Sequence, residues 1–210
     1  MKRMHARATV QRLLALCGAL ALAPAAFPAT LATEAPEPRE VTTHPIFREP
    51  FSCSQHWEGN LAMSGDALGS DCVIQRMVER DGRRWMRAHS GEGLQNEDWF
   101  GWGQEVLSPC DCEVLKTREN GVVNTVGVLG KPPATAVMLK RDDGVFFAVA
   151  HLQGLRVKPG ERVAAGAVLG TVGNNGMSRH PHIHIGAWRG QEALQIRFDL
   201  RAMGRLLKDW

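Results

Sequence analysis

The sequence lacks any apolar run long enough to cross a bilayer, which takes about 18 consecutive apolar residues. Its first apolar run, at 13–22, falls short of that length and follows four basic residues at Lys2, Arg3, Arg7 and Arg12. A short apolar run after a basic start and before small residues is the pattern of a secretory signal peptide. The sequence therefore predicts a signal peptide at residues 1–32 and a secreted or periplasmic protein, with no stable membrane span once the signal is removed.

Two cleavage sites fit the small-x-small rule, Ala23-Pro24-Ala25 and Thr30-Leu31-Ala32, and the choice between them stays open. An N-terminal anchor that is never cleaved is the alternative to cleavage. Residues 33–45 are polar and proline-rich, which predicts a flexible tether. Residues 46–210 remain as a single domain with enough chain for a real core.

A strong excess of one charge is also absent. The whole chain has a formal charge of +3, but the first 32 residues hold four basic and no acidic side chains, so the remainder carries −1. A nucleic-acid-binding surface needs a basic patch or stripe, and this balance gives no case for one.

Four cysteines remain after the predicted signal, and an even number in an exported protein predicts disulfides. Cys110 and Cys112 are only two residues apart and are expected to be strained as partners. Each is therefore expected to pair with Cys53 or Cys72. A zinc site built on the C-x-C pair is the rival reading, disfavoured because an oxidising compartment competes for the thiols.

Helical periodicity and long repeats are scarce, and the pattern is that of a β protein. Short β-branched and apolar runs alternate with glycine turns, and 200–207 predicts a short terminal helix. The strands are expected at 113–115, 136–139, 145–152, 162–172 and 182–188. We predict a mainly β, single-domain fold with a short C-terminal helix.

The sequence His180-Pro181-His182-Ile183-His184-Ile185-Gly186 is the strongest sign of chemistry. Residues two apart in a strand share a face, so His182 and His184 aim two imidazoles at one point. Converging neutral imidazoles suit a first-row metal, most often zinc.

Other elements precede this pair in a specific order. His89 and Asp98 come first, then Gly103-Gln104-Glu105-Val106, then His151-Leu152 and a glycine rhythm at 157–170. This order resembles the lysostaphin/LytM-type zinc endopeptidases, which cleave peptidoglycan cross-links, over 89–188. The resemblance implies the antiparallel β-sandwich or barrel-like hybrid fold of that family.

The resemblance also implies roles for five residues. His89, Asp98 and His184 would bind zinc, and His151 and His182 would be metal-free catalytic histidines. Two imidazoles and one carboxylate leave a fourth tetrahedral position for water, as in catalytic zinc sites. Which histidine is the general base stays open.

The match departs from the family pattern in three respects. The spacing from His89 to Asp98 exceeds that of many members, so His56 is the alternative first ligand and Glu97 the alternative carboxylate. Cys112 replaces the usual turn glycine. The chain has no tyrosine, which removes the aromatic hydroxyl that some relatives place near the site.

The leading functional prediction is an exported zinc endopeptidase whose substrates are peptidoglycan stem peptides. The alternative is an inert or latent LytM-like module that binds cell wall or activates another wall hydrolase, and a regulatory protein partner fits either. A zinc peptidase acting on a protein is a third hypothesis. Residues 115–135 are expected to form a loop beside the groove, and specificity resides in such loops.

Overall fold

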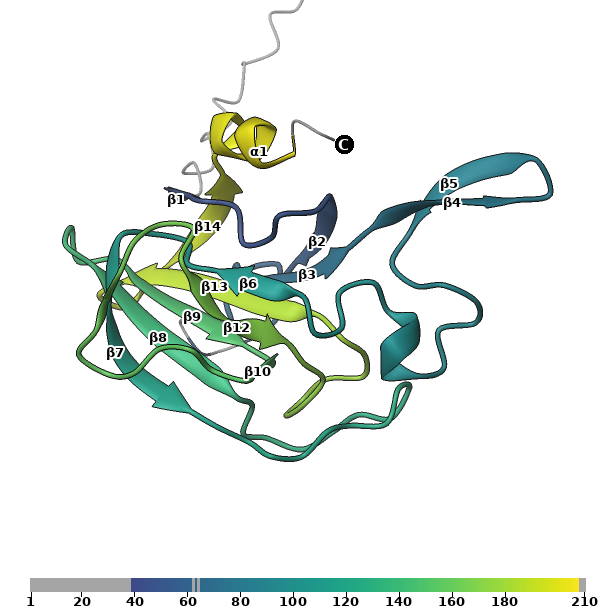
Figure 1. Cartoon of the computed structure of the whole chain (residues 1–210). Helices are drawn as coiled ribbons and strands as arrows, with labels where there is room; N and C mark the ends of the chain where they lie inside the picture. Colours follow the sequence, from purple (N-terminus) through teal and green to yellow (C-terminus); the bar gives the residue numbers. More distant parts are fainter. Residues whose placement is uncertain (1–38, 62, 64, 208–210) are drawn as a thin grey trace, which may run out of the picture. The chain divides into compact units, whose positions relative to one another are not determined.

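The computed structural model describes residues 39–61, 63 and 65–207 (Figure 1). The predicted signal peptide lies outside these residues. The described part is mainly β, and its one α-helix, α1, lies near the C-terminus at Leu200–Leu206, which confirms the predicted fold class. None of the described helices has the length and apolar character that a bilayer crossing demands.

A nine-stranded sheet forms the main layer. Its hydrogen-bonded order is β1-β14-β13-β9-β8-β7-β11, and β3 joins it by pairing with β13, with β2 outside β3. All neighbours are antiparallel except β1 and β14. The strands are β1 (Glu40–Thr43), β2 (Phe51–Gln55), β3 (Ser70–Ile74), β7 (Cys112–Arg118), β8 (Ala136–Arg141), β9 (Phe146–Ala150), β11 (Arg162–Val163), β13 (Ile183–Arg189) and β14 (Glu192–Phe198).

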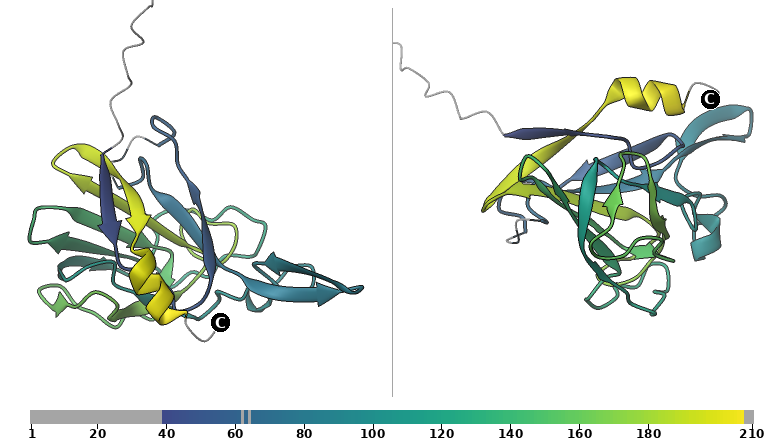
Figure 2. Two further views of the ribbon diagram at one scale, coloured as in Figure 1. Left: turned by 90° about the horizontal axis from the view of Figure 1, so that it is seen from above. Right: turned by 60° about the vertical axis from the view of Figure 1, so that its left-hand side comes forward.

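A second sheet has the order β10-β12-β6 and lies beside the main sheet (Figures 1 and 2). Its strands are β6 (Glu105–Leu107), β10 (Leu152–Gln153) and β12 (Val168–Val172). Apolar side chains of both sheets form one core cluster, in which Val106 and Leu169 of the small sheet join Phe147 and Ile183 of the large one. The alternation of buried and less buried residues along β8 and β9 reflects this one-sided burial.

The domain begins earlier than the sequence predicts. Glu40–Thr43 forms β1, which pairs with β14 and buries Val41 and Thr43. Residues 40–43 therefore belong to the sheet, and the described part of the predicted 33–45 tether is not a linker. Polar composition concealed this strand because only alternate side chains face the core.

A two-stranded hairpin interrupts the chain between β3 and β6. Its strands, β4 (Arg76–Arg80) and β5 (Arg83–Arg87), form a sheet of their own that projects from the body (Figures 1 and 2). A short 3-10 helix, η1 (Asn96–Asp98), follows. This insertion separates β3 from the Gly103 segment along the chain.

The predicted disulfide pairing is wrong. Cys53 pairs with Cys72 and Cys110 pairs with Cys112, with Cα–Cα distances of 4.1 and 5.4 Å. Cys53 and Cys72 lie directly opposite each other on β2 and β3, so the strand register itself brings them together. Cys112 begins β7 while Cys110 lies in the preceding turn, which lets two near neighbours meet.

Candidate metal centre

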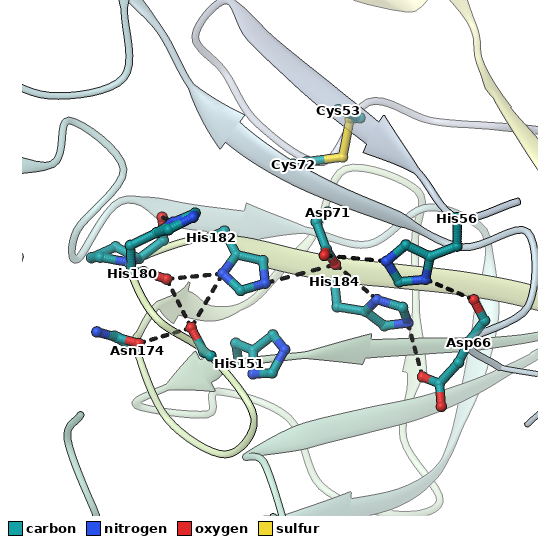
Figure 3. Close-up of polar contacts among 12 residues, drawn as sticks. Cys53, His56, Asp66, Asp71, Cys72, His151, Asn174, His180, His182 and His184 are labelled. Atoms are coloured by element: carbon teal, nitrogen blue, oxygen red, sulfur yellow. Dashed lines mark hydrogen bonds and ion pairs between the residues drawn. A yellow bond between two sulfur atoms is a disulfide. The ribbon is translucent and has the colours of Figure 1, made fainter. Parts of the chain in front are cut away.

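Strand β13 supplies the middle of the site. Ile183 and Ile185 are fully buried in the core, while His182 and His184 face the opposite side. His184 is paired with Asp71 on β3 along one edge of β13 and with Ala150 on β9 along the other. Residues far apart in sequence thus meet at one point (Figure 3).

Three side chains form a metal-type donor set. One potential ligand atom from each of His56, Asp71 and His184 lies within 4.8 Å of the other two. Among the described residues, this is the one group of three or more such side chains that could hold a metal ion. His184 Nδ1 is 3.0 Å from Asp71 Oδ1, and His56 Nε2 is 3.2 Å from Asp71 Oδ2. The carboxylate of Asp71 therefore lies between the two imidazoles.

The remaining nitrogen of each imidazole faces a backbone carbonyl. His184 Nε2 is 3.0 Å from Gly65 O, and His56 Nδ1 is 2.9 Å from Asp66 O. A carbonyl only accepts, so these two nitrogens carry the protons and donate. The other two nitrogens then point lone pairs at a carboxylate that is also an acceptor.

This arrangement requires positive charge beside Asp71, which protons or a cation can supply. Burial alone raises the pKa of the Asp71 carboxyl, but the hydrogen bond to His184 and the neighbouring imidazoles hold it well below its usual range. Burial lowers the pKa of His184, yet contact with Asp71 outweighs this and raises it. Two imidazoles and a carboxylate, each histidine fixed by a second hydrogen bond, are the donor set of a catalytic zinc site.

A close backbone approach positions His184. The carbonyl of Gly65 lies so near Gly186 that a Cβ at position 186 would collide with it. Glycine at the end of the His-Ile-His-Ile-Gly sequence therefore allows the 65–66 carbonyls to reach the imidazoles.

Two further buried histidines adjoin the centre. The rings of His151 and His182 are 4.6 Å apart, and His182 Nε2 is 3.7 Å from Asp71 Oδ1. His151 Nδ1 is 2.7 Å from Asn175 O, and His182 Nδ1 is 2.8 Å from His180 O. Each Nδ1 therefore donates, which leaves Nε2 as a free acceptor.

Burial keeps both histidines neutral. Burial and the neighbouring His182 lower the pKa of His151 to about 3, and burial lowers that of His182. His151 also has a φ of 65°, a left-handed conformation rare for residues other than glycine. Such backbone strain concentrates at functional sites.

The structure departs from the predicted ligands at His89 and Asp98. Neither belongs to the group of three: His89 packs against Trp99 at 5.0 Å, and Asp98 Oδ2 accepts from the Gln95 amide at 3.0 Å in η1. His56, the alternative first ligand, lies in the group, whereas Glu97, the alternative carboxylate, does not. His184, His151 and His182 lie together as expected.

Sequence reasoning missed Asp71, although a signal existed. If Cys53 and Cys72 are paired, β2 and β3 form a hairpin in which Ser54 lies opposite Asp71 and His56 follows close by. The wrong disulfide pairing and the missed candidate ligand therefore have one cause. Local spacing could not find a pair of metal-type donors brought together by strand register.

Two cavities adjoin the centre, and both have Asp71, His180 and His182 in their walls. The first, about 520 Å³, is also lined by His56, His151 and His184, and its apolar wall includes Leu129 and Pro132 of the predicted groove-side loop. The second, about 340 Å³, is lined by Ser52, Ser54, Val73 and Trp99 besides the shared residues.

A β domain whose buried histidines and aspartate converge in this way has the donor chemistry of a metal-dependent hydrolase. Residues 98–196 match the model of peptidase family M23, which confirms the predicted resemblance to this family. The matched segment contains His151, His182 and His184, whereas His56 and Asp71 precede it.

Solved structures that resemble this chain include two peptidases and one chain of a protein complex. The catalytic domain of lysostaphin from Staphylococcus simulans is 16% identical, with 69% of this chain and 86% of that one covered and a TM-score of 0.42. The deep-sea M23 metalloprotease pseudoalterin is 15% identical, with coverages of 73% and 74% and a TM-score of 0.42. A chain of the SpoIIIAH–SpoIIQ complex is 16% identical, with coverages of 72% and 95% and a TM-score of 0.46.

Proposed function

We propose that this chain is an exported zinc endopeptidase that hydrolyses peptide cross-links of peptidoglycan. One observation carries the proposal: two imidazole lone pairs and a carboxylate converge, with each imidazole held by a carbonyl on its other nitrogen. Zinc is the metal that such a donor set favours. The match of residues 98–196 to peptidase family M23 supports a peptidase, and export rests on the predicted signal peptide.

His56, Asp71 and His184 would hold the metal. When bound, zinc would polarise the scissile carbonyl and lower the pKa of water toward about 7. His151 and His182 are neutral near pH 7 and present Nε2 as an acceptor, so either can take a proton from the attacking water. The protonated imidazole can then return the proton to the leaving amine or stabilise the oxyanion.

The direct test is cleavage of purified peptidoglycan by the mature chain. Phenanthroline should abolish the release of cross-link fragments and zinc should restore it, while a non-chelating phenanthroline isomer should have no effect. Cleavage that persists after complete removal of the metal would contradict the proposal.

The alternative, an inert or latent wall-binding or activating module, makes a different prediction. The described site retains candidates for every ligand and both catalytic histidines, which favours the enzyme. Under the alternative, a His184→Ala variant would still support the cellular role of the protein. Under the enzyme proposal, that variant fails.

A further inference from the structure

The β4–β5 hairpin (Arg76–Arg87), here called the arm, carries an unusual distribution of charge. It contains five arginines and two acidic residues. Its register pairs Arg76 with Arg87, Val78 with Trp85 and Arg80 with Arg83, and these six residues share one side of the ribbon, the basic face. The opposite side carries the pairs Met77–Met86 and Glu79–Arg84.

Two arginine pairs directly opposite each other on one face are unfavourable for a hairpin. Arg76 is partly compensated by a bidentate contact to Glu49 at 2.6 and 2.8 Å. At the tip, the one acidic neighbour of Arg80 is Asp81 at 3.8 Å, and both side chains are exposed. Such a pair contributes little, so the tip keeps its positive charge.

The arm also exposes aromatic surface between these charges. Trp85 remains 38% exposed on the basic face, and the arm pairs with no other sheet in the described structure. An isolated two-stranded ribbon is marginally stable in water. Arginines around an exposed tryptophan therefore cost stability here and suit an anionic polymer with rings or apolar edges that can stack.

A continuous row of side chains joins the arm to the metal centre. Arg87 Nη2 is 3.3 Å from His89 Nδ1, and His89 packs on Trp99. Trp99 stacks on His180 with centroids 4.3 Å apart and planes within 2°, and the His180 ring is 5.2 Å from His182. Trp99 and His180 also line the second cavity, which reaches Asp71 and His182.

We propose that the basic face of the arm is a docking surface for the carboxylate-bearing strand of peptidoglycan, which reaches the metal centre through the second cavity. The inference rests on the proposed function for the identity of the polymer. Stem-peptide carboxylates would pair with Arg80 and Arg83, and the ring of Trp85 would cover the strand between them. The wall strand is favoured over a lipid surface because the arm leads directly into the cavity beside the centre.

The test is co-sedimentation of the mature chain with purified peptidoglycan sacculi, in chelator so that no cleavage occurs. The variant Arg80→Gln/Arg83→Gln should bind about five- to tenfold more weakly, and binding of the wild type should weaken as salt rises. The matched control Arg201→Gln/Arg205→Gln removes the same charge from exposed sites on α1 and should bind like the wild type. Sacculi whose carboxylates have been amidated should lose the difference between variants.

Three outcomes would overturn the inference: equal binding by the arm variant, equal losses in both double variants, or binding to phosphatidylglycerol vesicles but not to sacculi. A thermal melt of each variant excludes unfolding as the cause. Wild-type cleavage of sacculi, measured separately with zinc, tests the proposed function. If the wild type cleaves sacculi but the arm variant binds them as well as the wild type does, the docking role of the arm is refuted and the proposed function stands.

Discussion

The candidate metal centre and the arm are stabilised in opposite ways. In the centre, β2, β3, β9 and β13 converge, and His151, His182 and His184 are buried. Backbone carbonyls fix these three histidines and His56. The arm has only its own ladder, with exposed side chains and arginines opposite arginines. Precise placement of reacting groups requires the first arrangement, whereas contact with a long, variable polymer tolerates the second.

The largest expected effect concerns the two histidines outside the ligand set. His151→Ala and His182→Ala should each lower kcat by about 10²–10⁴, because each removes a proton acceptor without removing a metal ligand. Zinc content and steady-state rates on a peptide substrate measure this. His44→Ala, at a half-buried histidine outside the centre, should keep its rate, and loss of zinc from the His151 variant would contradict the assigned roles.

Removal of the Cys53–Cys72 disulfide should weaken the centre through the fold. The bond closes a loop with a sequence separation of 19, so the double serine variant should lose about 3 kcal/mol of unfolding free energy. The bond also ties the strands that bring His56 to Asp71, so zinc affinity should fall as well.

The matched comparison is the Cys110–Cys112 double serine variant. Its separation of 2 predicts a smaller loss of about 1.5 kcal/mol and no change in zinc affinity. Urea denaturation and zinc titration of both variants measure the difference. A larger loss of zinc affinity in the Cys110–Cys112 variant would contradict the claim that the Cys53–Cys72 bond supports the centre.

Acid should destabilise the metal-free domain through His151. Its pKa is about 3 in the folded protein and 6.5 in the unfolded chain, so below pH 6.5 the unfolded chain takes up a proton that the folded protein does not. This contribution to stability falls with pH, by about 1 kcal/mol between pH 7 and 5.5. Urea melts should show a smaller acid loss for His151→Asn, and equal losses would contradict a neutral buried imidazole.

The smallest expected effect on stability is in the arm. Arg80→Gln/Arg83→Gln should raise the unfolding free energy by no more than about 0.5 kcal/mol, because a directly opposed like-charge pair is removed. Differential scanning calorimetry measures this. A loss of several degrees in Tm would mean that these arginines support the fold rather than a partner.

Local pattern predicted the second half of the molecule well. The alternation in His182-Ile183-His184-Ile185 placed two imidazoles on one face because strand period and burial are both local properties. The runs at 136–139 and 182–188 are strands, and 200–206 is a helix. The site role of His151, by contrast, came from the family resemblance, and its ring lies 4.6 Å from that of His182.

The first half could not be predicted in the same way. His56 and Asp71 meet through the register of β2 with β3 and of β3 with β13, which no spacing along the chain encodes. The arm and η1 then separate Asp71 from Gly103, so a search backward from the glycine found Asp98 at the expected distance. Asp98 is the first residue of the segment that matches the family model, but its side chain accepts from the Gln95 amide in η1 and does not join the candidate metal centre.

The most direct test is the zinc content of the purified mature chain and five single alanine variants. We expect one zinc per chain in the wild type and in His89→Ala and Asp98→Ala, and its loss in His56→Ala, Asp71→Ala and His184→Ala. Zinc retained by the Asp71 variant and lost from the Asp98 variant would contradict it.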